Sequence, residues 1–438
     1  MGIFDLLFGI ILAVFANFFA KGIQNGINDP FLKKYFVRGL QVKLIGALAT
    51  GVIYFYYYES GDTVFYYKRA SYLADLFLDD IGTYIEVMFS GAESMDPYVQ
   101  VHLDAIVSRD QSSVIVPKIA SIFYLFSLGS YFAIAVIFAC ISYLGVWAMF
   151  VAWHKIFPKG GTAIAVAALF VPSTFFWGSG IFKDTITYSC LCWVFAIAHD
   201  LVEKGRTTPL RWFILIVSIW LIGVIKSYIL MVLMPSIFFL LFLRFQYRIK
   251  SAAFRWVLMP VVIAISLGLG SVTLQVLANQ FQKFSIENIE TKATDMQRWH
   301  TVVEEKIDEG SHYSLGDVSF TPAGLASKFP QAVNVTLFRP YLWEAGNPVL
   351  FLAFLESNLF LYFTIILILL RPFKAFAHIW SNPYIVFALI FALIFAFGVG
   401  FTSYNFGALV RYKIPCLPFY AMVLAYLWEI KKGRIQPG

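Results

Sequence analysis

Long apolar runs follow one another along the whole chain and are separated by shorter polar stretches. Several runs hold about 18 or more mainly apolar residues, enough for a helix to cross a bilayer core of roughly 30 Å. The runs are continuous and do not alternate with a period of two, so they predict helices and not the strands of an outer-membrane barrel. The pattern predicts an all-α, polytopic integral membrane protein with a single membrane domain over residues 1–438.

The composition narrows the class further. Of the 438 residues, 60% are hydrophobic and 13% are charged, whereas a soluble domain carries about 25% charged residues. This excludes a soluble enzyme and a nucleic-acid-binding protein, and the net charge of +7 is assigned to basic cytoplasmic loops. The four cysteines lie inside apolar runs without CxxC spacing, which indicates small buried residues.

The distribution of basic residues predicts about eleven spans, with the N-terminus outside and the C-terminus in the cytoplasm. A cluster of basic residues at 21–43 follows the first run and places that stretch in the cytoplasm. The run 212–243 would extend about 48 Å as one helix, so it predicts two short helices that turn at Lys226-Ser227-Tyr228. The spans are expected near 1–20, 42–58, within 119–153, 163–180, 185–201, twice over 212–243, and at 256–277, 348–370, 384–402 and 414–429.

Two long outer loops are expected, at 59–118 and 278–345. The first holds ten acidic and four basic residues, and the second is the most polar part of the chain. Residues 69–88 alternate apolar and acidic side chains, which predicts an amphipathic helix at the membrane surface. A helix that packs within the loop explains the same pattern. Loops of this length are often functional.

Five basic residues occupy expected outer positions, where the charge rule predicts few of them. Ionisable groups at membrane depth usually face a cavity and have a function. Several cations that converge there would bind a phosphate or pyrophosphate. The alternative is that each reaches the membrane interface or pairs with an acid, as Lys183 could with Asp184. The five are Lys183, Lys226, Arg339, Arg411 and Lys413.

The first outer loop opens with Glu59-Ser60-Gly61-Asp62. A carboxylate held just above the membrane can act as a general base or bind a metal, although Gly-Asp is also common in turns. The six histidines are scattered without HExxH spacing, which argues against a zinc site. The chain has no Walker loop or dinucleotide fingerprint, which argues against direct use of ATP or NAD.

Three short stretches together resemble a known enzyme class. They are GDTVFYY at 61–67, PSTFFWGSGIFKD at 172–184 and RYKIP at 411–415. The set resembles the GT-C class of membrane glycosyltransferases that use polyprenyl-phosphate sugars, and is most similar to poorly characterised bacterial members associated with surface polysaccharides. The resemblance is distributed along most of the chain, and WGSGIFKD is its most specific part.

The resemblance implies that an acidic residue in the first outer loop serves the reaction centre, which by position is Asp62. Two departures from the class stand out. In the class this loop usually follows the first span, whereas here it follows the second expected span. Many members also have paired acids in the loop, whereas here the nearest other acid is Glu59, three residues away. The second departure leaves open whether the reaction needs a divalent cation such as Mg or Mn.

The implied activity is sugar transfer from a polyprenyl-(pyro)phosphate donor to a glycan or lipid-linked acceptor. It would occur in a bacterial inner membrane, with the active site facing the periplasm or exterior. Asp62 would take the acceptor proton, while Lys183, Arg411 and Lys226 would stabilise the departing phosphate. Arg339 and Lys413 complete the expected phosphate-binding set. The expected supporting residues are Glu59, Asp184, Tyr66, Trp177, Tyr228 and Glu344.

Other functions fit parts of the same pattern. An O-antigen-type polysaccharide polymerase would use the same cations, and its product would be a ladder of repeat lengths instead of one added sugar. A transporter or flippase for lipid-linked oligosaccharides would also hold an anionic headgroup, although no matched halves are visible in the sequence. A membrane scaffold would explain the outer loops but not the cations. In each case the expected partners include membrane lipids and no nucleic acid.

Overall fold

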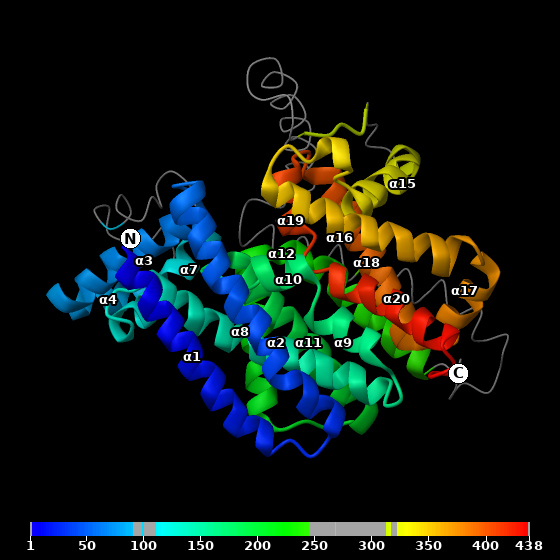
Figure 1. Cartoon of the computed structure of the whole chain (residues 1–438), viewed down its shortest axis with the longest axis horizontal. Helices are drawn as coiled ribbons and strands as arrows, with labels where there is room; N and C mark the ends of the chain where they lie inside the picture. Colours follow the sequence, from blue (N-terminus) through cyan, green and yellow to red (C-terminus); the bar gives the residue numbers. More distant parts are fainter. Residues whose placement is uncertain are drawn as a thin grey trace. The chain divides into compact units, whose positions relative to one another are not determined.

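The computed structural model describes residues 2–90, 99, 111–245, 268, 312–316 and 322–436, and within them the chain is all-helical (Figure 1). Within these ranges, seven helices are long and apolar enough to cross a membrane, or eight if the bent pair Phe406–Tyr412 and Leu417–Lys431 is one span. The prediction of an all-helical chain is confirmed for these residues, and the long apolar helices are consistent with a polytopic membrane protein. The expected total of eleven spans and their orientation stay predictions.

The chain divides into two compact units. Unit 1 consists of Met1–Val151, Thr174–Ile197 and Thr207–Lys226. Unit 2 consists of Ala152–Ser173, Ala198–Arg206 and Ser227–Gly438.

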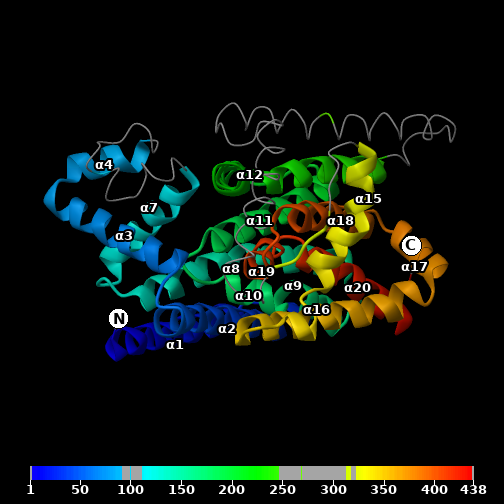
Figure 2. The ribbon, with the colours of Figure 1, turned by 90° about the horizontal axis from the view of Figure 1, so that it is seen from above.

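Unit 1 begins with two long helices that lie side by side, α1 (Ile3–Asn25) and α2 (Pro30–Val52) (Figure 2). A π-helical turn, η1 (Ile53–Tyr57), continues α2. The expected second span, 42–58, lies within this continuous helix, which begins twelve residues earlier. The Asp29 side chain accepts from the Leu32 amide at 2.9 Å, and Pro30 occupies the first helical position, so the helix starts there. Lys43, expected in the cytoplasmic stretch, is buried within α2.

The first expected outer loop contains α3 (Asp62–Asp79), α4 (Ile81–Phe89) and the beginning of α7 (Gln111–Phe126). The single helix expected over 69–88 is broken at Asp80, whose side chain caps α4. Tyr84 and Val87 pack into a small core with α3 and α7, so the packing interpretation holds for this face. The opposite face of α4 exposes large apolar side chains one turn apart: Ile81, Ile85 and Phe89. Residues 91–98 and 100–110 of this loop lie outside the described part.

Four helices follow: α8 (Tyr131–Ile156), α9 (Thr162–Leu169), α10 (Pro172–Trp177) and α11 (Lys183–Lys204). The span expected at 163–180 is replaced by the short helices α9 and α10, of eight and six residues. Proline disfavours helical geometry at the residue before it, and thus separates the two at Val171-Pro172. The glycines at 178 and 180 follow directly. The span expected at 185–201 is present as α11.

The apolar run after α11 forms α12 (Pro209–Phe245), which contains a break at Lys226. The backbone of Lys226 has φ −146° and ψ 68°, outside the helical region. The turn predicted at Lys226-Ser227-Tyr228 is therefore present as a break in the helix. The border between units 1 and 2 falls at the same place.

The C-terminal part of unit 2 contains α15 (Pro322–Phe338), the 3-10 turn η3 (Leu342–Glu344), α16 (Pro348–Thr364) with its π-helical end η4 (Ile365–Leu369), α17 (Pro372–Trp380), α18 (Pro383–Thr402), α19 (Phe406–Tyr412) and α20 (Leu417–Lys431). Helix α15 lies in the expected second outer loop and packs against α18. The Thr336 hydroxyl donates to the Ala396 carbonyl at 2.7 Å across this contact. The expected span 256–277, apart from Gly268, and residues 278–311 and 317–321 lie outside the described part.

Candidate functional site

The turn that carries Asp62 packs directly on an aromatic ring of unit 1. Gly61 has φ +117°, and a Cβ at this position would lie 2.5 Å from Cε1 of Tyr54, so the turn requires glycine. Asp62 is the first residue of α3 and is half-buried, while Glu59 before it is exposed. The chain thereby places the start of α3 next to η1.

Tyr54 links this turn to the WGSGIFKD stretch. Its ring centroid lies 5.4 Å from that of Phe182 and 6.2 Å from that of Trp177. Trp177 and Phe182 also contact each other, at 6.1 Å. Two of the three stretches that carry the resemblance thus meet within unit 1. Trp177, an expected supporting residue, is buried in this cluster, and Tyr66, another of them, is also buried.

Lys183, the first residue of α11, follows Phe182 directly. Its Nζ donates to the Ser112 hydroxyl at 2.8 Å and to the Ser113 hydroxyl at 3.1 Å, both on α7. Helix α7 packs against α3, which begins at Asp62. The expected catalytic acid thus stands at the start of α3, and the expected phosphate-binding cation is bound at the start of the neighbouring α7.

Asp184 and Lys226 form a buried ion pair between α11 and α12, with Lys226 Nζ donating to Asp184 Oδ1. The sequence had left open a pair between Lys183 and Asp184, but the carboxylate is bound by Lys226. Lys226 stands at the break in α12, where a non-helical backbone redirects the chain. Lys226 is thus the ion-pair partner of Asp184, and its expected role as a phosphate ligand stays a prediction.

Lys43 is a buried cation that the sequence analysis missed. Its Nζ donates to the Gly178 carbonyl and lies 5.8 Å from the ring centroid of Tyr188 on α11. The apolar residues on both sides of Lys43 in the sequence indicate that it is buried. The nearby Lys33, Lys34 and Arg38 instead favoured its assignment to a cytoplasmic cluster. Unit 1 therefore gathers three lysines around α11 and the residues just before it.

A close helix contact explains why the WGSGIFKD region fits against α2. A Cβ on Gly46 would lie 2.1 Å from the Phe175 carbonyl oxygen, so only glycine allows this approach. The Thr185 hydroxyl then bonds the Gly180 carbonyl at 2.6 Å and fixes the start of α11. These backbone contacts position Lys183 and Asp184.

The remaining expected cations belong to unit 2. Arg339 pairs with Glu344 through two of its nitrogens, one of them at 3.0 Å, and its guanidinium lies 5.0 Å from the ring centroid of Phe406. The alternative of pairing with an acid is therefore realised for Arg339. Lys413 is buried and donates to the Ser357 hydroxyl at 2.9 Å. Arg411 is half-buried in the last turn of α19.

Tyr228, an expected supporting residue, also belongs to unit 2, where its ring lies 5.9 Å from that of Phe395. The five expected cations are thus divided, with Lys183 and Lys226 in unit 1 and the other three in unit 2. Their convergence on one anion stays a prediction.

Glu356 is a second buried charge that the sequence analysis missed. It lies on α16, accepts the Ser173 amide at 2.6 Å and the Ser173 hydroxyl at 2.8 Å, and interacts electrostatically with Lys413. In the sequence, Glu356 is the one acidic residue of the apolar run 348–370, and this position indicates a buried charge. Intramembrane carboxylates often have a function, but these contacts also give Glu356 a structural task at the start of α10.

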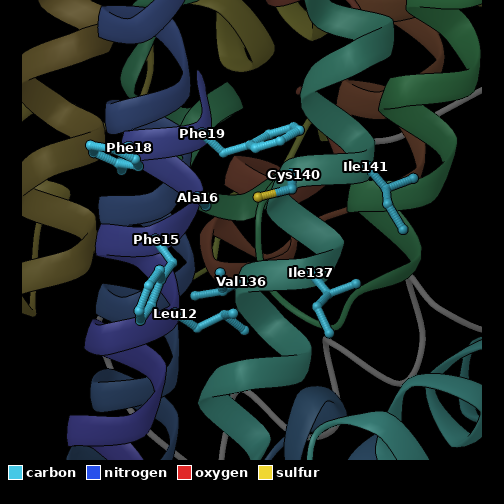
Figure 3. Close-up of a pocket in the computed structure, with 9 residues that line it drawn as sticks. All are labelled: Leu12, Phe15, Ala16, Phe18, Phe19, Val136, Ile137, Cys140 and Ile141. Carbon is cyan, nitrogen blue, oxygen red and sulfur yellow. The ribbon is translucent and has the colours of Figure 1, made fainter. Parts of the chain in front are cut away.

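An apolar groove of about 430 Å³ lies between α1 and α8 of unit 1 (Figure 3). Its walls come from the phenylalanines of α1 and from aliphatic residues and one cysteine of α8: Leu12, Phe15, Ala16, Phe18, Phe19, Val136, Ile137, Cys140 and Ile141. Helix α8 begins at Tyr131, whose hydroxyl is 2.7 Å from that of Thr63, the neighbour of Asp62. The groove therefore starts about 8 Å along α8 from a residue bonded to the Asp62 turn.

Within the described ranges, no group of three or more His, Cys, Asp or Glu side chains is placed to hold a metal ion. Comparisons of the chain with protein-family models, curated proteins and solved structures found no match.

Proposed function

We propose that the protein is a membrane glycosyltransferase that moves a sugar from a polyprenyl-(pyro)phosphate donor to a glycan or lipid-linked acceptor at the outer face of a bacterial inner membrane. The observation that carries the proposal is the contact of the Asp62 turn with the WGSGIFKD stretch through Tyr54 and Phe182. Asp62 and the cation Lys183 each directly follow a residue of this contact, Gly61 and Phe182 respectively.

In the proposed reaction, the acceptor hydroxyl oxygen attacks the anomeric carbon of the donor and gives its proton to the Asp62 carboxylate. The bond between the anomeric carbon and the phosphate oxygen breaks, and the polyprenyl (pyro)phosphate leaves with the bonding electrons. Lys183 stabilises the negative charge that grows on this leaving group. Lys226 acts indirectly, because it holds the carboxylate of Asp184, the residue that follows Lys183.

The groove between α1 and α8 supports the choice of a lipid-linked donor. Its walls are almost entirely apolar, and its first residue on α8, Val136, follows five residues after Tyr131, which is hydrogen-bonded to Thr63. An isoprenoid tail in this groove would direct its phosphate toward the Asp62 turn.

The test uses the full-length protein in nanodiscs with polyprenyl-phosphate donors that carry radiolabelled sugars. We expect Asp62→Asn to reduce transfer at least about a hundredfold, the usual contribution of a general base, with unchanged thermal unfolding. Asp75→Asn, which removes an exposed acid from the same helix α3, is the matched control and should keep full activity.

Full activity of Asp62→Asn would contradict the assignment. The product pattern separates the remaining functions, because one added sugar indicates a transferase and a ladder of repeats indicates a polymerase. Movement of the lipid-linked sugar between leaflets without any new product would identify a flippase.

A further inference from the structure

A polar cavity of about 400 Å³ lies where α8, α11 and α12 end and α18 begins. It falls in the range of roughly 300–1,000 Å³ that small-molecule sites occupy. All of its wall residues belong to unit 2, and none is part of the proposed transfer site. They are Lys155, Ile156, His199, Glu203, Lys204, Arg244, Asn382, Pro383 and Tyr384.

Two lysines at this cavity are positioned by one buried acid. Asp200 Oδ1 lies 3.4 Å from the Lys155 Nζ and 3.3 Å from the Lys204 Nζ. Both lysine side chains are about half exposed, whereas Asp200 is buried. The buried carboxylate thus holds both ammonium groups in the cavity wall, and part of each lysine side chain stays accessible.

Arg244 is positioned in the same way by a second acid. Its Nη2 donates to Glu203 at 2.8 Å, and the other oxygen of Glu203 accepts the Tyr384 hydroxyl at 2.6 Å. The cavity is thereby bordered by three cations and two carboxylates, which leaves a formal excess of one positive charge. Arginine and lysine together are the side chains that proteins use to bind phosphate oxygens.

His199 supplies an unsatisfied polar atom in the cavity wall. It is 4% exposed, and its Nδ1 has no hydrogen-bond partner among the described residues. The nearest carboxylate oxygen, Oδ1 of Asp200, is 3.6 Å away, beyond hydrogen-bond distance. Buried polar atoms normally have partners, so the cavity wall is incompletely hydrogen-bonded at His199.

We propose that this cavity binds a phosphate group, held by Lys155, Lys204 and Arg244 with His199 as a further contact. The proposal does not depend on the transferase activity. Basic pockets between the ends of membrane helices suit the headgroups of anionic lipids. A soluble phosphate compound has the same recognition chemistry, so the experiment distinguishes the two sources.

The full-length protein is placed in phosphatidylcholine nanodiscs, in one arm with added inorganic phosphate and in the other with part of the lipid replaced by phosphatidic acid. A ligand that binds the native state raises the unfolding temperature, so we expect a rise in at least one arm. Arg244→Gln and Lys155→Gln should each weaken this response, by about tenfold in apparent affinity. Two variants are used so that the failure of one to fold leaves the other informative.

Arg434→Gln is the matched control. Arg434 pairs with Glu429 at 3.2 Å, is similarly exposed and lies outside the cavity, so its loss should leave the phosphate response unchanged. A response to phosphatidic acid alone would identify a lipid headgroup, and a response to inorganic phosphate would identify a soluble ligand. No response in either arm, or a response that both cavity variants retain, would overturn the proposal.

Discussion

At the scale of single residues, the buried pair of Lys226 and Asp184 has a measurable energetic consequence. Removing one member leaves an uncompensated charge in a buried place, which costs about 3 kcal/mol or more. We therefore expect Lys226→Met to lower the unfolding free energy by about this amount. Thermal unfolding of the purified protein in detergent measures the change.

A double-mutant cycle provides the control for this pair. Asp184→Leu should also destabilise the protein, but the double variant Lys226→Met with Asp184→Leu should lose much less than the sum of the two. Strictly additive losses would show that the two side chains do not interact in the folded protein.

Some of these residues could be predicted from the sequence and others could not. A lysine in the middle of a 32-residue apolar run marks Lys226, and the charge pattern alone predicted a break there. Its partner could not be predicted, because Asp184 lies 42 residues away and meets Lys226 only through the packing of α11 against α12. Lys43 was missed because its neighbours in sequence are basic, while its neighbours in space are Gly178 and Tyr188.

At the scale of helices, the contact of Gly46 with the Phe175 carbonyl predicts a strong effect of one methyl group. In Gly46→Ala the new Cβ would meet a backbone atom at 2.1 Å, so α2 and the segment before α11 must move apart. Overpacking of this kind costs about 1–3 kcal/mol, and we expect a clear fall in the unfolding temperature.

Gly22→Ala is the matched control for this contact. Gly22 also lies in a helix, α1, and a Cβ there would meet nothing within 4 Å. Because alanine is the better helix former, this change should be neutral or slightly stabilising. Equal unfolding temperatures for the two variants would contradict the close contact at Gly46.

The long helices were predictable because a continuous apolar run can form little else in a membrane. The spans expected at 185–201, 348–370 and 384–402 correspond closely to α11, to α16 with η4, and to α18. The two short helices in the region 163–180 were not predictable from its apolar character. The region contains one proline and two glycines, which are residues that end helices. There, local backbone preferences outweigh the hydrophobic pattern.

At the scale of the whole molecule, the charge distribution predicts which side of the membrane each end faces. In a variant whose four cysteines are replaced, we expect Ser60→Cys to react with a membrane-impermeant maleimide from outside the cell. Lys432→Cys should react only after the membrane is permeabilised. Both positions are exposed, so a lack of reaction reports topology and not burial.

Arg371→Cys, at an exposed position between α16 and α17, should behave like Lys432→Cys and serves as an internal check. Labelling of residues 60 and 432 from the same side would contradict the predicted orientation. The apolar runs of the sequence were enough to predict a helical membrane protein, but they did not determine the number of spans. Length and apolarity alone do not show whether a broken helix such as α12 crosses the membrane once or twice.

The division into two units has a consequence for biosynthesis. Unit 1 ends at Lys226, so all of its parts are available when about half of the chain has left the ribosome. Unit 2 is different, because its segments Ala152–Ser173 and Ala198–Arg206 are made early and their partners follow after Ser227. Ser173 must wait for Glu356, 183 residues later, before its amide and hydroxyl are satisfied. During translation these two early segments therefore wait in the nascent chain for partners that are made after Ser227.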